Sequence, residues 1–295
     1  MTPAGSCSLV LAFGTTLALV VGGPAQTGVV RALEGAVGLP PAGARGDKPL
    51  ALAQRFVAAD QAELLLLLDE LGRDERDPHQ AARAIAELLA AGQTDAVTDH
   101  ALESLGRLGA REARDSLVVY LRHRRPETRS RAYAALALLH DPGDAATLAQ
   151  GLRDAAPEVR ATAARALGDL KVADSAPLLL RALGRGVSEA AAALGKLGDA
   201  ASVDEFGKYL GKQPLTVMLA GYANYLARAD LPEPAKLKIV AALEEVSGPV
   251  VKQFLSDQVA KPPTSRSQKL QRALSATLAR IKVEAVPGAR SEQSP

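Results

Sequence analysis

Few side chains in this sequence have types and spacings suited to metal chemistry. The 295 residues include one cysteine, Cys7, and four histidines, His79, His100, His123 and His140. Two histidine ligands on one helix face are typically four residues apart, and no two of these have that spacing. A histidine near a helix C-terminus interacts favourably with the helix dipole, and we assign that role to His123 and His140. We therefore expect no metal site.

No catalytic motif is found in the sequence. Gly184-Arg185-Gly186 lacks the third glycine and the preceding strand of a dinucleotide-binding loop. There is no G-x-S-x-G elbow and no H-E-x-x-H pair. Cys7 lies in an N-terminal apolar segment, which excludes it as a catalytic thiol. We expect no catalytic residues and no cofactor.

The largest charge cluster contains five arginines around Glu127: Arg122, Arg124, Arg125, Arg129 and Arg131. Arg122, Arg124 and Arg125 are our candidates for contact with an anionic partner. The alternative is a solvated turn in which Arg129 pairs with an acid of a neighbouring unit. Arg129 and Arg160 share one repeat position, which favours a structural role for these two.

These residues lie within a repeat. Leu105, Leu136 and Leu167 are 31 residues apart, as are Leu117, Leu148 and Leu179. Pro126-Glu127-Thr128-Arg129 recurs as Pro157-Glu158-Val159-Arg160. Self-similarity at a fixed period of this length indicates an array of stacked units.

Each unit reads as two helices joined by a tight turn. In the third copy, Pro157 opens the first helix, and Val159, Ala163 and Leu167 lie on one face of it. Asp174 or Ser175 is suited to cap the second helix, which Gly184 ends. Neither helix alone buries its apolar face, so the units must stack.

The stretch Pro-Glu-Val-Arg-Ala-Thr-Ala-Ala-Arg-Ala-Leu-Gly-Asp-Leu (157–170) resembles the first helix of HEAT repeats, in the short form found in phycobilin-lyase-like HEAT proteins. Leu194 to Asp199 resembles the same signature at a helix end. The resemblance implies an all-α, right-handed solenoid whose concave face, usually lined by the second helices, binds other proteins. The family includes enzymes and nucleic-acid binders, so the resemblance does not fix function.

We divide the chain into four parts. These are an N-terminal apolar leader or signal peptide (1–26), a Gly/Ala/Pro-rich linker (27–50), a solenoid of about six to seven helix pairs (51–283, clearest at 94–211) and a disordered tail (284–295).

The leader suggests export. Leu9 to Val21 is mostly apolar, and Gly23-Pro24-Ala25 offers small residues for cleavage before Gln26. A signal peptide normally starts with basic residues, and none precedes Arg31. An exported protein is our expectation. An uncleaved membrane anchor and a cytoplasmic protein are the alternatives.

Three segments depart from the regular pattern. Ala51 to Leu71 contains five consecutive leucines, which predicts one helix buried on all sides. Four residues are missing from the fourth unit near Gly184 to Gly186, which predicts a short or distorted helix.

Lys261 to Lys282 has six basic and no acidic side chains. We prefer to read it as the polar cap of the array, the alternative being a basic helix that binds membranes or nucleic acid.

A scaffold that binds an unidentified protein or peptide is the function this sequence favours. The alternatives are a bilin-lyase-like enzyme and a nucleic-acid-binding HEAT protein. The chain has no tryptophan, four phenylalanines and five tyrosines, and its net charge is +2. Stacking platforms for bases are therefore scarce, and a strong polyanion footprint is missing.

Overall fold

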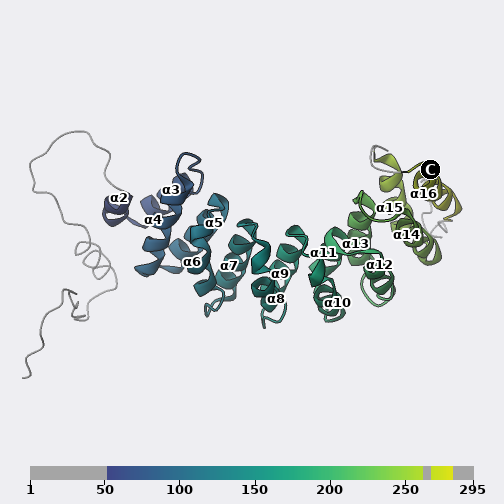
Figure 1. The fold of residues 1–295 in the computed structure, drawn as a ribbon. Helices are drawn as coiled ribbons and strands as arrows, with labels where there is room; N and C mark the ends of the chain where they lie inside the picture. Colours follow the sequence, from purple (N-terminus) through teal and green to yellow (C-terminus); the bar gives the residue numbers. More distant parts are fainter. Residues whose placement is uncertain (1–51, 262–266, 282–295) are drawn as a thin grey trace, which may run out of the picture.

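The structure, a computed structural model, describes residues 52–261 and 267–281, which form fifteen α-helices and no β-strand (Figure 1). The helices are α2 (Leu52–Ala58), α3 (Gln61–Leu71), α4 (Pro78–Ala90), α5 (Asp95–Leu108), α6 (Arg114–Tyr120), α7 (Pro126–Leu138), α8 (Ala145–Gly151), α9 (Pro157–Asp169), α10 (Ala176–Gly184), α11 (Glu189–Leu197), α12 (Ala200–Gly207), α13 (Leu215–Ala227), α14 (Glu233–Val246), α15 (Pro249–Ala260) and α16 (Gln268–Arg280). The predicted leader (1–26), linker (27–50) and tail (284–295) lie outside the described residues.

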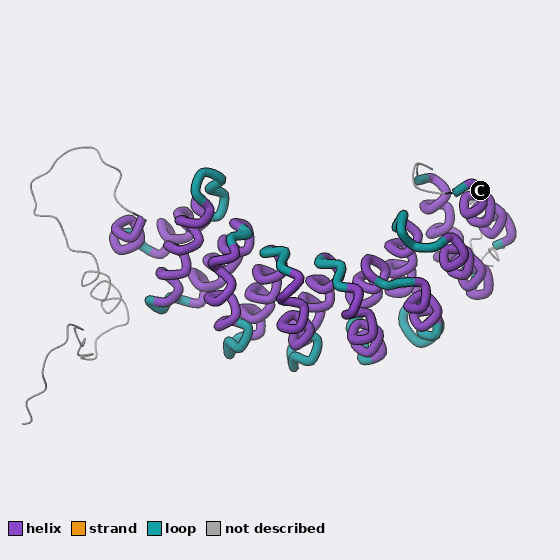
Figure 2. Tube along the Cα trace, in the orientation of Figure 1, coloured by secondary structure: helices purple, strands orange, loops and turns teal. Residues whose placement is uncertain are grey.

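From α3 to α16 the helices form seven consecutive pairs that stack along one row (Figures 1 and 2). The first helices α3, α5, α7, α9, α11 and α13 pack on one another in turn, and the second helices α4, α6, α8 and α10 each pack against the first helix of the next unit. At the C-terminal end the pattern changes, because α14 and α15 both pack on α16. Leu105, Leu136 and Leu167 are fully buried, as are Leu117, Leu148 and Leu179. The predicted all-α solenoid of stacked pairs is confirmed.

Small residues let the first helices approach closely. A Cβ added at Gly106 would lie 2.8 Å from the Cα of Ala135. A Cβ added at Gly168 would lie 2.7 Å from the Cα of Ala193. Since these distances are shorter than any van der Waals contact, a glycine at these positions is required by the spacing of the first helices.

The two rows of helices differ in spacing, and the array is curved. The first helices contact their neighbours extensively, whereas successive second helices touch much less. In Figure 1, α6, α8, α10 and α12 lie along the outer edge of the curve. The expectation that second helices line the concave side is wrong for this chain, because the closely packed first helices form the inner row.

The second helices of the regular units are short and begin differently from our expectation. A 3₁₀ turn, Ala173–Ser175, leads into α10, and neither Asp174 nor Ser175 forms a side-chain cap. The backbone N–H of Ala176 instead bonds to the carbonyl of Ala173. The 3₁₀ turn thus supplies the hydrogen bonds that a capping side chain would supply.

The first helices end in a conserved backbone geometry across three units. Gly109, His140 and Lys171 are 31 residues apart and have φ values of +61°, +51° and +51°. This left-handed conformation is common just after a helix, where it satisfies the last carbonyls. The repeat therefore governs backbone conformation at this position even where the residue is not glycine.

The segment from Ala51 to Leu71 is not one buried helix. Asp60 interrupts it and caps α3, with Glu63 completing a reciprocal capping box. Leu67 and Leu68 are buried, but Leu66 is 72% exposed. The prediction was wrong because α3 is the first full helix of the described array, so only one side of it is covered by the next units.

The fourth unit is shortened as predicted. Helix α11 has 9 residues, whereas α9 has 13. The missing turn is at its N-terminus, where Arg185 and Gly186 form a turn with Gly186 at a φ of +84°.

We predict that Gly168→Ala destabilises the array by about 1–3 kcal/mol, because the added methyl group overpacks the contact with Ala193. Urea unfolding followed by circular dichroism measures the change. Gly207→Ala is the matched control, since its Cβ would meet nothing closer than 3.8 Å. Equal stability of Gly168→Ala and wild type would contradict the proposed role of this contact.

Candidate anion-binding edge

The arginine cluster predicted from the sequence separates into two groups in the structure. Arg125, at the N-cap of α7, lies 3.3 Å from Asp95 and 3.4 Å from Asp99, both on α5. Its Nε also lies 3.8 Å from Glu127. Arg125 is therefore held by acids, and its assignment to an anionic partner loses its basis.

Arg129 has the structural role that its repeat position suggested. Its guanidinium donates two hydrogen bonds to Asp154, at 2.9 and 2.7 Å, and one each to the carbonyls of His123 and Arg124. It thus ties together the turns that follow α6 and α8. Arg160 donates to the carbonyls of Asp154 and Ala155 in the same manner.

The Arg129–Asp154 pair is largely shielded from solvent, with side-chain exposures of 16% and 14%. Burial by itself would raise the pKa of Asp154. Hydrogen bonds from Arg129 and from the N–H of Ala156 outweigh burial, and the pKa of Asp154 is lowered. The carboxylate is therefore stabilised in its charged form by the folded state.

Charges on the exposed face of the first helices are also paired with one another. Arg131 on α7 reaches Glu103 at 2.8 Å and Asp99 at 3.3 Å, both on α5. The same face carries the pairs Arg107–Asp69 (3.1 Å) and Lys196–Asp169 (2.5 Å). These pairs join neighbouring first helices, so the inner face largely neutralises its own charge.

Arg122 and Arg124 remain exposed and form no ion pair within the described residues. Among the other exposed cations without an ion pair, four lie on the same edge of the array. They are Arg153, Arg181, Arg185 and Lys212. All lie at or beyond the ends of the second helices α6, α8, α10 and α12. We call these six residues the basic edge.

The basic edge is continuous across units. Arg153, Arg181 and Arg185 line one small hollow. The turn containing Arg124 is joined to the turn after Arg153 by Arg129, which bonds to both. A cluster of like charges creates a local potential that attracts groups of opposite charge, such as carboxylates.

Sequence reasoning identified only one end of the basic edge. Arg153 follows Arg122 by 31 residues, and Lys212 follows Arg185 by 27, which are the offsets of their units. The repeat register of the sequence therefore showed that these cations recur at matching positions of successive units. A search for dense charge clusters missed it because the later cations are separated along the chain.

Comparison with known proteins agrees with this architecture. A family model described as HEAT repeats matches residues 82–156 and 145–227. This chain is a HEAT-repeat protein. The matched residues span α4 to α13 and include the basic edge.

Two solved structures are similar to this HEAT-repeat chain. One is the complex of CpcE and CpcF of phycocyanin lyase from Nostoc sp. PCC7120, with 17% identity, a TM-score of 0.45, and coverage of 83% of this chain and 99% of that one. The other is an engineered protein with 19% identity, a TM-score of 0.34, and coverage of 76% and 69%. No curated protein matches the sequence.

The histidines do not converge in the HEAT array. His79 contacts Glu112 at 3.0 Å, and Nδ1 of His123 accepts a hydrogen bond from the N–H of Arg125. His140 occupies the left-handed position after α7. Among residues 52–261 and 267–281, no three histidine, cysteine or acidic side chains are grouped as metal ligands.

The basic C-terminal segment faces acids of α14. Arg280 binds Glu244 at 3.0 Å, and Lys269 lies 3.9 Å from Glu233. Arg266 and Lys282 lie outside the described residues. Because α14 supplies counter-charges, the described part of this segment fits the polar cap of the array better than a free basic helix.

We predict that Asp154→Asn destabilises the protein by about 1–3 kcal/mol at neutral pH, because Arg129 loses its charged partner. Stability from a lowered carboxyl pKa is present above the unfolded pKa of about 4 and is lost as the pH falls through the folded pKa. The difference between variant and wild type should therefore shrink in acid.

Urea unfolding between neutral pH and about pH 2 tests this. Asp115→Asn serves as the control, because the Asp115 side chain is 95% exposed, and it should change stability by less than about 0.5 kcal/mol. A difference for Asp154→Asn that is independent of pH would contradict the assignment.

Proposed function

We propose that this protein is a non-enzymatic scaffold that binds an acidic segment of a partner protein along the basic edge. The observation that supports the proposal is the contrast between two surfaces. On the inner face, Arg107, Arg131 and Lys196 are paired with acids of neighbouring helices, whereas the six cations of the basic edge have no ion-pair partner in the described part of the chain.

A protein partner fits the surroundings of the basic edge better than a nucleic acid does. Single-stranded nucleic acids are bound by grooves that combine cations with exposed aromatic rings. Tyr133, which interacts electrostatically with Arg122, is buried. Tyr120 is partly buried, and its hydroxyl donates a hydrogen bond to the carbonyl of Leu89. Neither offers a free ring face for stacking.

The spacing of the cations suggests how an acidic segment would lie. Packed helices are about 8–10 Å apart, so the units are at least this far apart along the outer edge, and three residues of extended chain span about 10 Å. An extended peptide with an acid at every third position would therefore place one carboxylate beside each unit.

We predict that a peptide with glutamate at every third position binds more tightly than one with the same glutamates in a block. Changing Arg122, Arg124 and Arg153 to Glu should weaken binding about tenfold, since each exposed ion pair contributes about 0.5 kcal/mol. Fluorescence anisotropy of the labelled peptide at low and physiological salt measures both effects.

A matched control reverses three exposed cations that lie elsewhere, Arg111, Lys252 and Arg272, and changes the net charge equally. Equal loss of binding in the two triple variants would show a non-specific charge effect and reject the site. Tighter binding of single-stranded poly-uridine than of the peptide would favour the nucleic-acid reading instead.

Export, or attachment to a membrane, belongs to the same proposal. It is motivated by the apolar stretch Leu9 to Val21 and the small residues before Gln26. Within residues 52–261 and 267–281, no helix has the length and apolar character needed to cross a bilayer.

We predict that the mature chain begins near Gln26 and is recovered from an extracytoplasmic fraction. Cell fractionation followed by N-terminal sequencing of the purified protein tests this. An intact Met1 in the cytosol would reject export, and an intact Met1 in the membrane fraction would indicate an anchored scaffold.

A further inference from the structure

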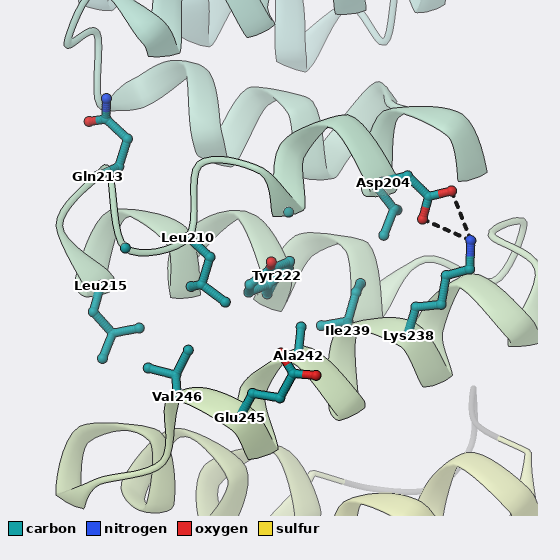
Figure 3. Close-up of a pocket in the computed structure, with 13 residues that line it drawn as sticks. Asp204, Leu210, Gln213, Leu215, Tyr222, Lys238, Ile239, Ala242, Glu245 and Val246 are labelled. Carbon is teal, nitrogen blue, oxygen red and sulfur yellow. Dashed lines mark hydrogen bonds and ion pairs between the residues drawn. The ribbon is translucent and has the colours of Figure 1, made fainter.

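A second surface of the array has the features of a binding site. A groove of about 520 Å³ lies between α12, the turn at 208–214 and α14 (Figure 3). It arises because α12 has 8 residues, whereas the neighbouring α13 and α14 have 13 and 14. Pockets of this volume are typical of sites for small ligands and peptide side chains.

The walls of the groove are mostly apolar. Val203 comes from α12, Leu210 from the following turn, and Ile239 from α14. Leu215, Ala242 and Val246 complete the lining. Val246 is 41% exposed, so an apolar occupant would bury surface that now contacts water.

Tyr222 supplies a polar group inside this groove. The residue is only 1% exposed, and its hydroxyl has no hydrogen-bond partner among the described residues. Its ring packs edge-on against Phe206 with centroids 5.1 Å apart, which fixes its position. Gly207 also lines the groove and has no side chain that would cover the Tyr222 hydroxyl. A Cβ added at Gly207 would lie 3.8 Å from the hydroxyl oxygen.

The Tyr222 hydroxyl borders the groove and forms no hydrogen bond with a described residue, so it can donate one to a ligand. Burial also raises the pKa of Tyr222 to about 12, so the group is protonated at neutral pH and available as a donor. The complementary ligand atom is an acceptor such as a peptide carbonyl.

The charges around the groove are unequal. Lys238 binds both carboxylate oxygens of Asp204 at 2.8 Å (Figure 3). Glu245 is exposed and forms no ion pair with any described residue. Among the residues that line the groove, the uncompensated charge is therefore negative, which disfavours anionic occupants such as fatty acids and favours a basic neighbour.

We infer that this groove binds a peptide segment with one large apolar side chain next to a basic residue. The apolar side chain occupies the space between Leu210 and Ile239, a peptide carbonyl accepts the hydrogen bond of Tyr222, and the basic side chain lies beside Glu245. The residues that line the groove do not include any of the basic edge, although Lys212 of that edge lies in the same turn.

Blocked dipeptide amides test the inference. Acetyl-Leu-Lys-amide should cause saturable chemical-shift changes at Ile239 and Val246 in NMR spectra of the full chain. Acetyl-Leu-Glu-amide should bind at least threefold more weakly, and acetyl-Ala-Lys-amide should cause no saturable change.

Variants connect binding to the groove. Tyr222→Phe should weaken acetyl-Leu-Lys-amide at least threefold, and Ala242→Phe should abolish its binding by filling the space. Tyr225→Phe is the matched control, because Tyr225 lies in the same aromatic cluster but does not line the groove. Glu245→Lys should reverse the preference between the Lys and Glu peptides.

Several results would overturn the inference. These are the absence of saturable chemical-shift changes with any peptide, or unchanged peptide binding in Ala242→Phe with its fold intact by circular dichroism.

Binding of the neutral dye Nile red without peptide binding would indicate a small-molecule site. Self-association that Ala242→Phe abolishes would identify a second copy as the occupant. Changing Arg122, Arg124 and Arg153 to Glu should leave dipeptide binding unchanged. The experiments therefore distinguish a failure of the groove proposal from a failure of the proposed function.

Discussion

The close approach of the first helices is the constraint on which the other features depend. Gly106 and Gly168 bring their helices against Ala135 and Ala193 at distances that no side chain would permit. Because the inner row is this tight and the units are wedge-shaped, the second helices spread apart on the outer side. That spreading places the turns that carry the arginines of the basic edge in solvent.

Contacts in this array are formed mainly between neighbours. Arg131 reaches back to α5, Lys196 reaches back to α9, and Arg129 joins two successive turns. Stability in such a molecule is approximately a sum of unit and interface contributions. A change at one unit is therefore transmitted mainly to adjacent units, so the two proposed sites, the basic edge and the groove, can be tested separately.

The repeat register predicted the regular part of the fold because the same leucines and turn residues return at each step. The break at Asp60 was missed, although the Asp60–Glu63 capping box was readable, because the five leucines suggested a single helix. The sequence did not show which arginines of the cluster are paired, because their acidic partners are distant along the chain. Arg125 contacts Asp95 and Asp99, and Arg129 contacts Asp154. The groove was equally hidden, because it results from the relative lengths of α12, α13 and α14.

Electrostatics explains why the outer edge is better suited than the inner face to recognise an acidic partner. A carboxylate that approaches Arg131 or Lys196 competes with an acid already in place, so the exchange yields little net free energy. At the basic edge, Arg153, Arg181 and Arg185 surround one hollow and repel one another in the unbound state. A bound carboxylate forms new ion pairs and also relieves this repulsion. Both contributions are screened by salt, so the same geometry that favours binding makes it sensitive to ionic strength.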